Sequence, residues 1–196
     1  MKIIKENLFT IIIVLTVMAG AGLIIFSARS GEDWRIQYAN NLGLNVDQFT
    51  KDITSATLKQ KVDADIKEGN DRGVTGTPTI FVNQVSLPFS ATIKDDLDKK
   101  ITELLATNPD QILIEEFTDY QCPVCKEYHT NVAELVTKYQ AEEKVVWVYK
   151  NYPIQNLHPF AYEAAIAVEA ARNQSKFTEM AELLYGNQEN FKGPKF

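Results

Sequence analysis

The chain has 196 residues, of which 45% are apolar and 23% are charged, and this composition excludes disordered and collagen-like proteins. Its formal net charge of −6 argues against nucleic acid as the main partner. Two cysteines allow one disulfide bond at most, which excludes a disulfide framework. The length suffices for a sizeable buried core, so a globular domain is expected.

The first thirty residues differ from the rest of the chain. No charged residue occurs from Asn7 to Ala28, and residues 8–26 are nearly all apolar. As a helix, such a stretch spans roughly 28 Å, close to the hydrocarbon core of a bilayer. Lys2 and Lys5 precede it and indicate a cytoplasmic N-terminus.

An uncleaved membrane anchor is favoured over a signal peptide, whose apolar stretch usually runs about 7–15 residues. Ala28 is a candidate cleavage position, but Phe26 is a poor fit for the small residue required two places earlier. We therefore expect residues 1–30 to anchor a single-pass protein in the cell membrane. Under either interpretation residues 31–196 are exported to the extracytoplasmic side.

Residues 31–196 alternate between helical and strand patterns. Apolar residues three or four positions apart predict two amphipathic helices, one through Phe49 and Ile53 and one through residues 58–66. The segments that follow are a breaker-rich loop at 73–78, a strand at 79–82, a helix at 93–104, a strand at 112–117, a helix from Cys122 to Tyr139, a strand at 145–149, and helices at 160–171 and 176–184. This order predicts an α/β fold.

The chemistry is concentrated in Cys122-Pro123-Val124-Cys125, which follows an expected strand and opens an expected helix. Unpaired N–H groups and the dipole at a helix N-terminus favour an anion, so the pKa of the Cys122 thiol should fall. The two-residue gap places Cys125 one turn further along, where it can attack a mixed disulfide on Cys122. The pattern predicts a nucleophilic thiol at Cys122 and a resolving thiol at Cys125.

A structural zinc site is the alternative use of these cysteines. His129 and His158 would complete four ligands, but the gap of thirty-two residues from Cys125 to His158 does not match zinc-finger spacing. We expect His129 on the solvent side of its helix and His158 near a helix start. No metal site is therefore predicted.

Several segments resemble DsbA-like thiol–disulfide oxidoreductases. Residues 114–125 (IEEFTDYQCPVC) resemble the active-site strand and helix start of that family. Residues 152–159 (YPIQNLHP) resemble the entry to its inserted helical domain, and residues 42–45 and 73–83 resemble its later helices and cis-proline loop. The resemblance covers residues 32–196 and implies a thioredoxin fold with a helical insertion and no cofactor.

The resemblance also implies the roles of individual residues. Cys122 is then the attacking thiol and Cys125 its partner, while Pro78, preceded by Thr77, is the cis-proline of a loop that faces the cysteines and pairs with the substrate chain. Glu116 matches a buried acid that accepts the proton of the resolving thiol. The alternative for Glu116 is a charge at the strand surface, because Glu115 is adjacent and one of the two must point outward.

Pro123 and Val124, between the cysteines, are expected to contact substrate and to tune the reduction potential. Potentials in the superfamily run from about −270 mV in thioredoxin to about −120 mV in DsbA. Neither side chain can donate a hydrogen bond to a thiolate, so a less oxidising potential is expected than in members with a histidine there. An exported location still favours net oxidation of substrates.

The order of the two halves departs from the family. Here the cis-proline half, residues 31–107, precedes the Cys-x-x-Cys half, residues 108–196, whereas relatives have the opposite order. A circular permutation explains this arrangement, and a tandem pair trimmed at both ends or an error in the gene model would give the same order. A short linker between the halves favours completion of the site within one chain over domain swapping.

The sequence thus predicts an exported, membrane-tethered enzyme that exchanges disulfides with protein thiols through Cys122 and Cys125. Its expected partners are substrate proteins with thiols or disulfides, a redox partner of unknown identity, and the membrane, but not nucleic acid. The alternative is a non-catalytic peptide-binding module of thioredoxin fold.

Overall fold

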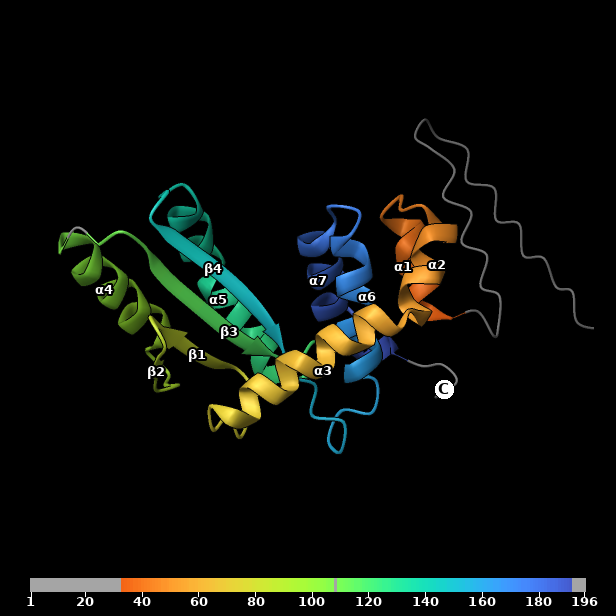
Figure 1. Cartoon of the computed structure of the whole chain (residues 1–196), viewed down its shortest axis with the longest axis horizontal. Coiled ribbons are helices and arrows are strands. Elements are labelled where there is room, and N and C mark those ends of the chain that lie inside the picture. The colour runs from red at the N-terminus through yellow and green to blue at the C-terminus, as the bar shows by residue number, and fades with distance from the viewer. Residues whose placement is uncertain (1–32, 108, 192–196) are drawn as a thin grey trace, which may run out of the picture. The chain divides into compact units, whose positions relative to one another are not determined.

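The structure is a computed structural model that describes residues 33–107 and 109–191 (Figure 1). In chain order the elements are α1 (Trp34–Asn41), α2 (Val46–Thr54), α3 (Ala56–Asp71), β1 (Thr79–Val82), β2 (Val85–Leu87), α4 (Ile93–Ala106), β3 (Ile112–Thr118), α5 (Pro123–Gln140), β4 (Val145–Asn151), α6 (Ala161–Arg172), α7 (Phe177–Gly186) and the short 3-10 helix η1 (Gln188–Asn190). Within these two ranges, no helix has the length and apolar character needed to cross a membrane. The anchor expected at residues 1–30 lies outside them.

One mixed sheet organises the later part of the chain. Its strand order is β2-β1-β3-β4. Strands β3 and β4 are parallel and are joined by α5, while β1 pairs antiparallel with both β2 and β3. A β-hairpin is thus added to a βαβ unit, and the sheet with its helices fits the expected thioredoxin-like α/β fold.

Both faces of the central strand β3 are covered. On one face, Ile114 packs in a core that includes Leu97 of α4 and Val132 of α5. On the other face, Phe117 packs with Phe81 and Val74. Residues buried on both faces are typical of a central strand flanked by two layers.

This covering corrects the expectation that either Glu115 or Glu116 points into solvent. The two residues do face opposite sides of the sheet, but they are only 6% and 1% exposed. Arg72, at the end of α3, donates to Glu115 over 2.8 Å and lies over the Phe81 ring. The buried Glu115 carboxylate is therefore stabilised by an ion pair with Arg72 and not by hydration.

A separate helical core is built from both halves of the chain. Helix α6 contacts α1, α2, α3 and α7, so elements from before and after the sheet strands pack side by side (Figure 1). Trp34, near the start of the described residues, stacks on Phe191 at their end, with ring centroids 4.9 Å apart. The two ends of the described chain therefore lie together.

Two elements had no clear signal in the sequence pattern. Helix α1 has no sustained apolar stripe, and β2 is a three-residue edge strand with Val85 exposed. The hairpin before β2 turns at Asn83 and Gln84, which both have positive φ angles of 47° and 68°. Two such residues form the tight turn that suits the twist of a hairpin, and asparagine favours it while glutamine does not.

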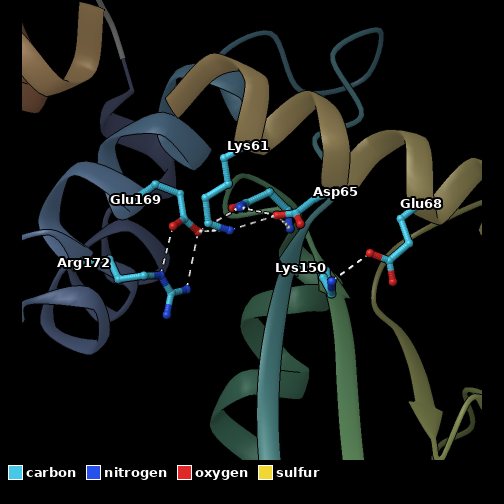
Figure 2. Close-up of polar contacts among 7 residues, drawn as sticks. Lys61, Asp65, Glu68, Lys150, Glu169 and Arg172 are labelled. Atoms are coloured by element: carbon cyan, nitrogen blue, oxygen red, sulfur yellow. Dashed lines mark hydrogen bonds and ion pairs between the residues drawn. The ribbon is translucent and has the colours of Figure 1, made fainter. Parts of the chain in front are cut away.

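A buried polar cluster joins α3, the end of β4 and α6 (Figure 2). The Asn151 side-chain amide donates to Asp65 at 2.8 Å and to Glu169 at 2.9 Å, and its backbone N–H donates to Asp65 at 3.0 Å. Lys61 lies 3.5 Å from both carboxylates, and Arg172 donates to Glu169 at 2.9 Å. The cluster links the cis-proline half to the Cys-x-x-Cys half.

Replacing Asn151 with alanine is expected to lower the free energy of unfolding by about 2–4 kcal/mol, because two buried carboxylates lose a donor at once. Urea denaturation followed by circular dichroism measures this loss. Asn173→Ala is the matched control, since Asn173 also donates to a carboxylate, that of Asp52 at 3.1 Å, but on the surface. Equal losses in the two variants would contradict the importance of burial.

Candidate active site

The two cysteines lie where β3 leads into α5. Cys122 is the N-cap residue of α5, and Pro123 occupies the first turn, where a missing N–H costs nothing. The Cys122 backbone N–H donates to the carbonyl of Asp119 at 3.1 Å and holds the turn in place. Both cysteines are free thiols and both are buried, with Cys122 6% and Cys125 0% exposed.

The surroundings give the two thiols different pKa values. The hydrogen bond from the Cys125 thiol, together with the backbone N–H groups of Val124 and Cys125, lowers the pKa of Cys122 to about 6, although burial acts in the opposite direction. Burial and the neighbouring Cys122 raise the pKa of Cys125. Cys122 is the residue suited to exist as a thiolate, and Cys125 the one suited to remain protonated.

The loop between α3 and β1 faces this pair. The Thr77–Pro78 peptide bond is cis, as the resemblance to DsbA-like proteins implies. The Cys122 thiol donates to the Thr77 carbonyl, with sulfur and oxygen 3.7 Å apart. Residues 45 positions apart in the sequence, one from each half, are thus brought into contact within a single chain.

Pro123 and Val124 lie on the outer side of the helix start. Both are exposed, and Val124, which retains 43% of its surface, is one of four exposed large apolar residues in the described part of the chain. Pro78, in contrast, is buried. The exposed apolar surface beside Cys122 is consequently made by the two residues between the cysteines.

Glu116 lies beneath the site on the face of β3 that α5 covers. Its Oε2 atom accepts from the Trp147 indole at 3.3 Å, and its Oε1 atom has no hydrogen-bond partner among the described residues. Burial raises the pKa of Glu116 to about 7, while hydrogen bonding from Trp147 and Thr118 lowers it. Glu116 and Cys125 both act electrostatically on Tyr128. Tyr128 is therefore within electrostatic reach of both the buried acid and the buried thiol.

Comparison with known families agrees with this geometry. Residues 28–101 match the model of the DSBA-like thioredoxin domain, and residues 109–195 match that of the family described as Thioredoxin. The chain is a DsbA-like member of the thioredoxin superfamily.

Curated relatives of this DsbA-like protein are much longer than it is. They include the Na(+)/H(+) antiporter NhaA 3 of Salinispora tropica, 35% identical over 81 residues, which are 41% of this chain and 12% of that protein. The Na(+)/H(+) antiporter NhaA 1 of Mycobacterium sp. (strain KMS) is 26% identical over 103 residues, 53% of this chain and 16% of that protein. The chain therefore matches only a small part of the length of these relatives.

Asp119 is a site residue that the motif contained but sequence reasoning did not single out. Its buried carboxylate accepts from the backbone N–H of Gln121 and of Ile154 and contacts His158 Nδ1, each at 2.8 Å. These contacts fasten the loop after β4 to the turn that carries Cys122. Its position three residues before Cys122, in the turn between the expected strand and helix, could have identified Asp119 as a site residue.

Gln188 is a second residue of the DsbA-like site, and no sequence pattern marked it. Its side-chain amide donates to the Tyr120 carbonyl at 3.0 Å and to the Cys122 carbonyl at 2.9 Å. It lies in η1, 66 residues beyond Cys122. Two hydrogen bonds from Gln188, near the end of the described chain, therefore hold the start of α5 in place.

The expectation that His129 faces solvent is wrong. Its ring is partly buried against Tyr185, with centroids 4.8 Å apart, and burial lowers its pKa. His158 lies just before α6 and is engaged with Asp119. In the part of the chain that the structure describes, no group of three or more His, Cys, Asp or Glu side chains is arranged to hold a metal ion.

Glu116→Gln is expected to stabilise the DsbA-like domain at high pH. Because the folded pKa of about 7 lies above the ordinary value of 4.5, Glu116 favours folding below pH 4.5 and loses this contribution as pH rises to 7. The variant should gain about 1–3 kcal/mol over the unsubstituted protein between pH 4 and pH 8, measured by urea denaturation. Glu115→Gln, which removes the ion pair with Arg72, is the control and should give no such gain.

Proposed function

We propose that this chain is a protein thiol–disulfide oxidoreductase that works through Cys122 and Cys125. The observation that carries the proposal is the placement of the low-pKa thiol of Cys122 between the Cys125 thiol and the Thr77 carbonyl. Cys122 has the lowered pKa that a nucleophile needs, Cys125 lies one turn further along α5, and the Thr77 carbonyl lies beside Cys122.

The exchange begins with the Cys122 thiolate attacking one sulfur of a substrate disulfide. A bond forms between Cys122 and that sulfur, and the second substrate sulfur leaves as a thiolate. Cys125 then gives its proton to Glu116 and attacks the Cys122 sulfur, so that the first substrate sulfur leaves in turn. The substrate gains two electrons, and a Cys122–Cys125 disulfide forms; the reverse sequence oxidises a substrate dithiol.

Substrate binding is assigned to Thr77, Pro78, Pro123 and Val124. A substrate chain lying along the Thr77–Pro78 backbone would have its sulfur near Cys122, because Thr77 already contacts that thiol. The exposed surface of Val124 and Pro123 offers apolar contact to a substrate without demanding a particular sequence.

The proposed setting is the extracytoplasmic side of the cell membrane, with residues 1–30 as anchor. The uncharged, apolar stretch near the N-terminus supports this location. The antiporter names of the relatives are in keeping with it, since ion exchange takes place across a membrane. An exported enzyme of this class needs a redox partner to restore its cysteines after each cycle.

The order of the two halves is proposed to be a circular permutation of the usual DsbA-like order. The segment matching the DSBA-like domain precedes the segment matching Thioredoxin. The stacking of Trp34 on Phe191 supports the proposal, because the ends that the usual order would join lie together. Residues 107–111 form the new connection between α4 and β3.

Residues 31–196, produced without the apolar segment, are expected to form an active monomer. The short connection at residues 107–111 keeps the two halves at about millimolar effective concentration relative to each other. Packing of the halves within one chain is therefore favoured over domain swapping between chains. Sedimentation equilibrium gives the mass, and the specific activity should not depend on protein concentration. A dimer whose specific activity falls on dilution would contradict this prediction.

The proposed function is tested by reduction of insulin with dithiothreitol and by oxidation of a reduced dithiol peptide. The chain should accelerate at least one of these reactions, and Cys122→Ala should abolish the acceleration. If the unsubstituted protein accelerates neither reaction and yet binds unfolded peptides, it is a binding module and the proposal is wrong.

A further inference from the structure

Gln188 binds both ends of the turn that carries Cys122. Its side-chain amide donates one hydrogen bond to the Tyr120 carbonyl at 3.0 Å and a second to the Cys122 carbonyl at 2.9 Å. An amide NH₂ group has two protons, so one glutamine can serve both carbonyls at once. The Cys122 carbonyl also accepts from the Lys126 backbone N–H at 3.2 Å, in the first turn of α5. These bonds fix the two ends of the turn relative to each other and to the helix.

Gln188 is itself held by anchors on both sides of it in the chain. On one side, the Asn187 side-chain amide donates to the Leu183 carbonyl of α7 at 2.7 Å. On the other side, Phe191 is 3% exposed and stacks on Trp34 of α1, with ring centroids 4.9 Å apart. The backbone that carries Gln188 is therefore already ordered, so little conformational entropy is lost when its side chain binds the turn.

The surroundings of the Cys122 sulfur depend on the conformation of this turn. Cys122 is the N-cap residue of α5, with φ −75° and ψ 122°, and the side chain of an N-cap residue lies near the first free N–H groups of its helix. Its sulfur lies 3.7 Å from the Thr77 carbonyl oxygen, so a small displacement of the turn would break this contact. The thiol of Cys125 and the N–H groups at the helix start lower the pKa of Cys122 to about 6. The same displacement would weaken the contribution of the N–H groups.

We propose that Gln188 is a positioning residue for Cys122, because its amide fixes the turn so that the thiol stays at the N-terminus of α5 and beside the Thr77 carbonyl. The inference rests on the proposed exchange reaction, in which Cys122 is the attacking thiol. Gln188 bonds to backbone carbonyls, so it acts on the sulfur through the backbone of residues 120–122. It lies in η1, 66 residues beyond Cys122, and the helical part of the fold thus contributes to the reactivity of a thiol at the start of α5.

The proposal is tested by alkylation of Cys122 with iodoacetamide as a function of pH in full-length Gln188→Met. Methionine keeps the length of glutamine but cannot donate a hydrogen bond. The midpoint should rise by about 0.5–1 pH unit, which corresponds to the net free energy of about one hydrogen bond. At pH 7 the equilibrium with glutathione should shift about 3- to 5-fold toward the Cys122–Cys125 disulfide, because the reduced protein loses part of the stabilisation of its thiolate.

Gln174→Met is the matched control. Gln174 is also partly buried and also makes two hydrogen bonds to backbone, donating to the Asn45 carbonyl at 3.2 Å and accepting from the Asn45 N–H at 2.8 Å. It joins the loop between α6 and α7 to the N-cap of α2 and not to the turn at Cys122. Its replacement should lower the free energy of unfolding, measured with urea, by a similar amount and leave the alkylation midpoint unchanged. Equal midpoint shifts in the two variants, or no shift in Gln188→Met, would overturn the proposal.

Gln188→Ala is the second variant, and it removes the side chain without introducing a longer apolar one. Its midpoint should rise as much as that of Gln188→Met, because both variants lose the same two hydrogen bonds. A raised midpoint in Gln188→Met alone would assign the effect to the methionine side chain and overturn the proposal. Alkylation requires no exchange activity, so the role of Gln188 and the proposed function fail separately: an unsubstituted protein that exchanges no disulfides contradicts only the proposed function.

Discussion

Replacement of Cys125 by serine is expected to leave substrate covalently attached to Cys122. The Cys122 thiolate still attacks, since the backbone N–H groups of Val124 and residue 125 continue to act to lower its pKa. The resolving attack is lost, because a serine hydroxyl cannot displace a thiolate. Release of substrate should slow by about 1,000-fold or more, on the scale of losing an activated nucleophile. Non-reducing gel electrophoresis with a disulfide-containing protein measures the adduct.

The reciprocal variant supplies the control. Cys122→Ser should form no adduct and show no exchange, because the remaining thiol of Cys125 is 0% exposed and its pKa is raised by burial. Accumulation of adduct in Cys122→Ser, and not in Cys125→Ser, would reverse the assignment of the two thiols.

The rate of alkylation of Cys122 by iodoacetamide is expected to rise with a midpoint near pH 6. At pH 7 most of this thiol is then ionised, whereas an ordinary cysteine with a pKa of about 8.5 is only a few per cent thiolate. The difference in reactive fraction is about 30-fold at pH 7. Stopped-flow alkylation or the thiolate absorbance at 240 nm gives the midpoint.

Cys125→Ala tests the cause of this low pKa. The hydrogen bond from the Cys125 thiol is the largest favourable contribution, so its removal should move the midpoint upward. The same pKa also affects stability: because the folded value lies below the unfolded one, Cys122 stabilises the reduced protein at high pH and loses this effect as pH falls through about 6. An unchanged midpoint in Cys125→Ala would show that the helix N-terminus alone lowers the pKa.

The sequence determined those features that depend on neighbouring residues. Asn45 and Ser55 cap α2 and α3 by accepting from the N–H groups of Gln48 and Leu58, which are only three residues further along the chain. The strand–turn–helix pattern around Cys122 was sufficient to predict that its thiol lies at the N-terminus of a helix and has a lowered pKa. A resemblance carried by short motifs pointed to Pro78, whose peptide bond is cis in the structure.

Tertiary structure decided what the residues face. The alternation of a strand placed Glu115 and Glu116 on opposite sides, but only the helices on both faces of the sheet bury the two carboxylates. The contact of Cys122 with Thr77 depends on β1 pairing beside β3, and the bond of Thr118 to Tyr185 depends on where α7 packs. Such contacts join positions far apart in the chain, and hydrophobic periodicity specifies only that a face is buried, not which partner covers it.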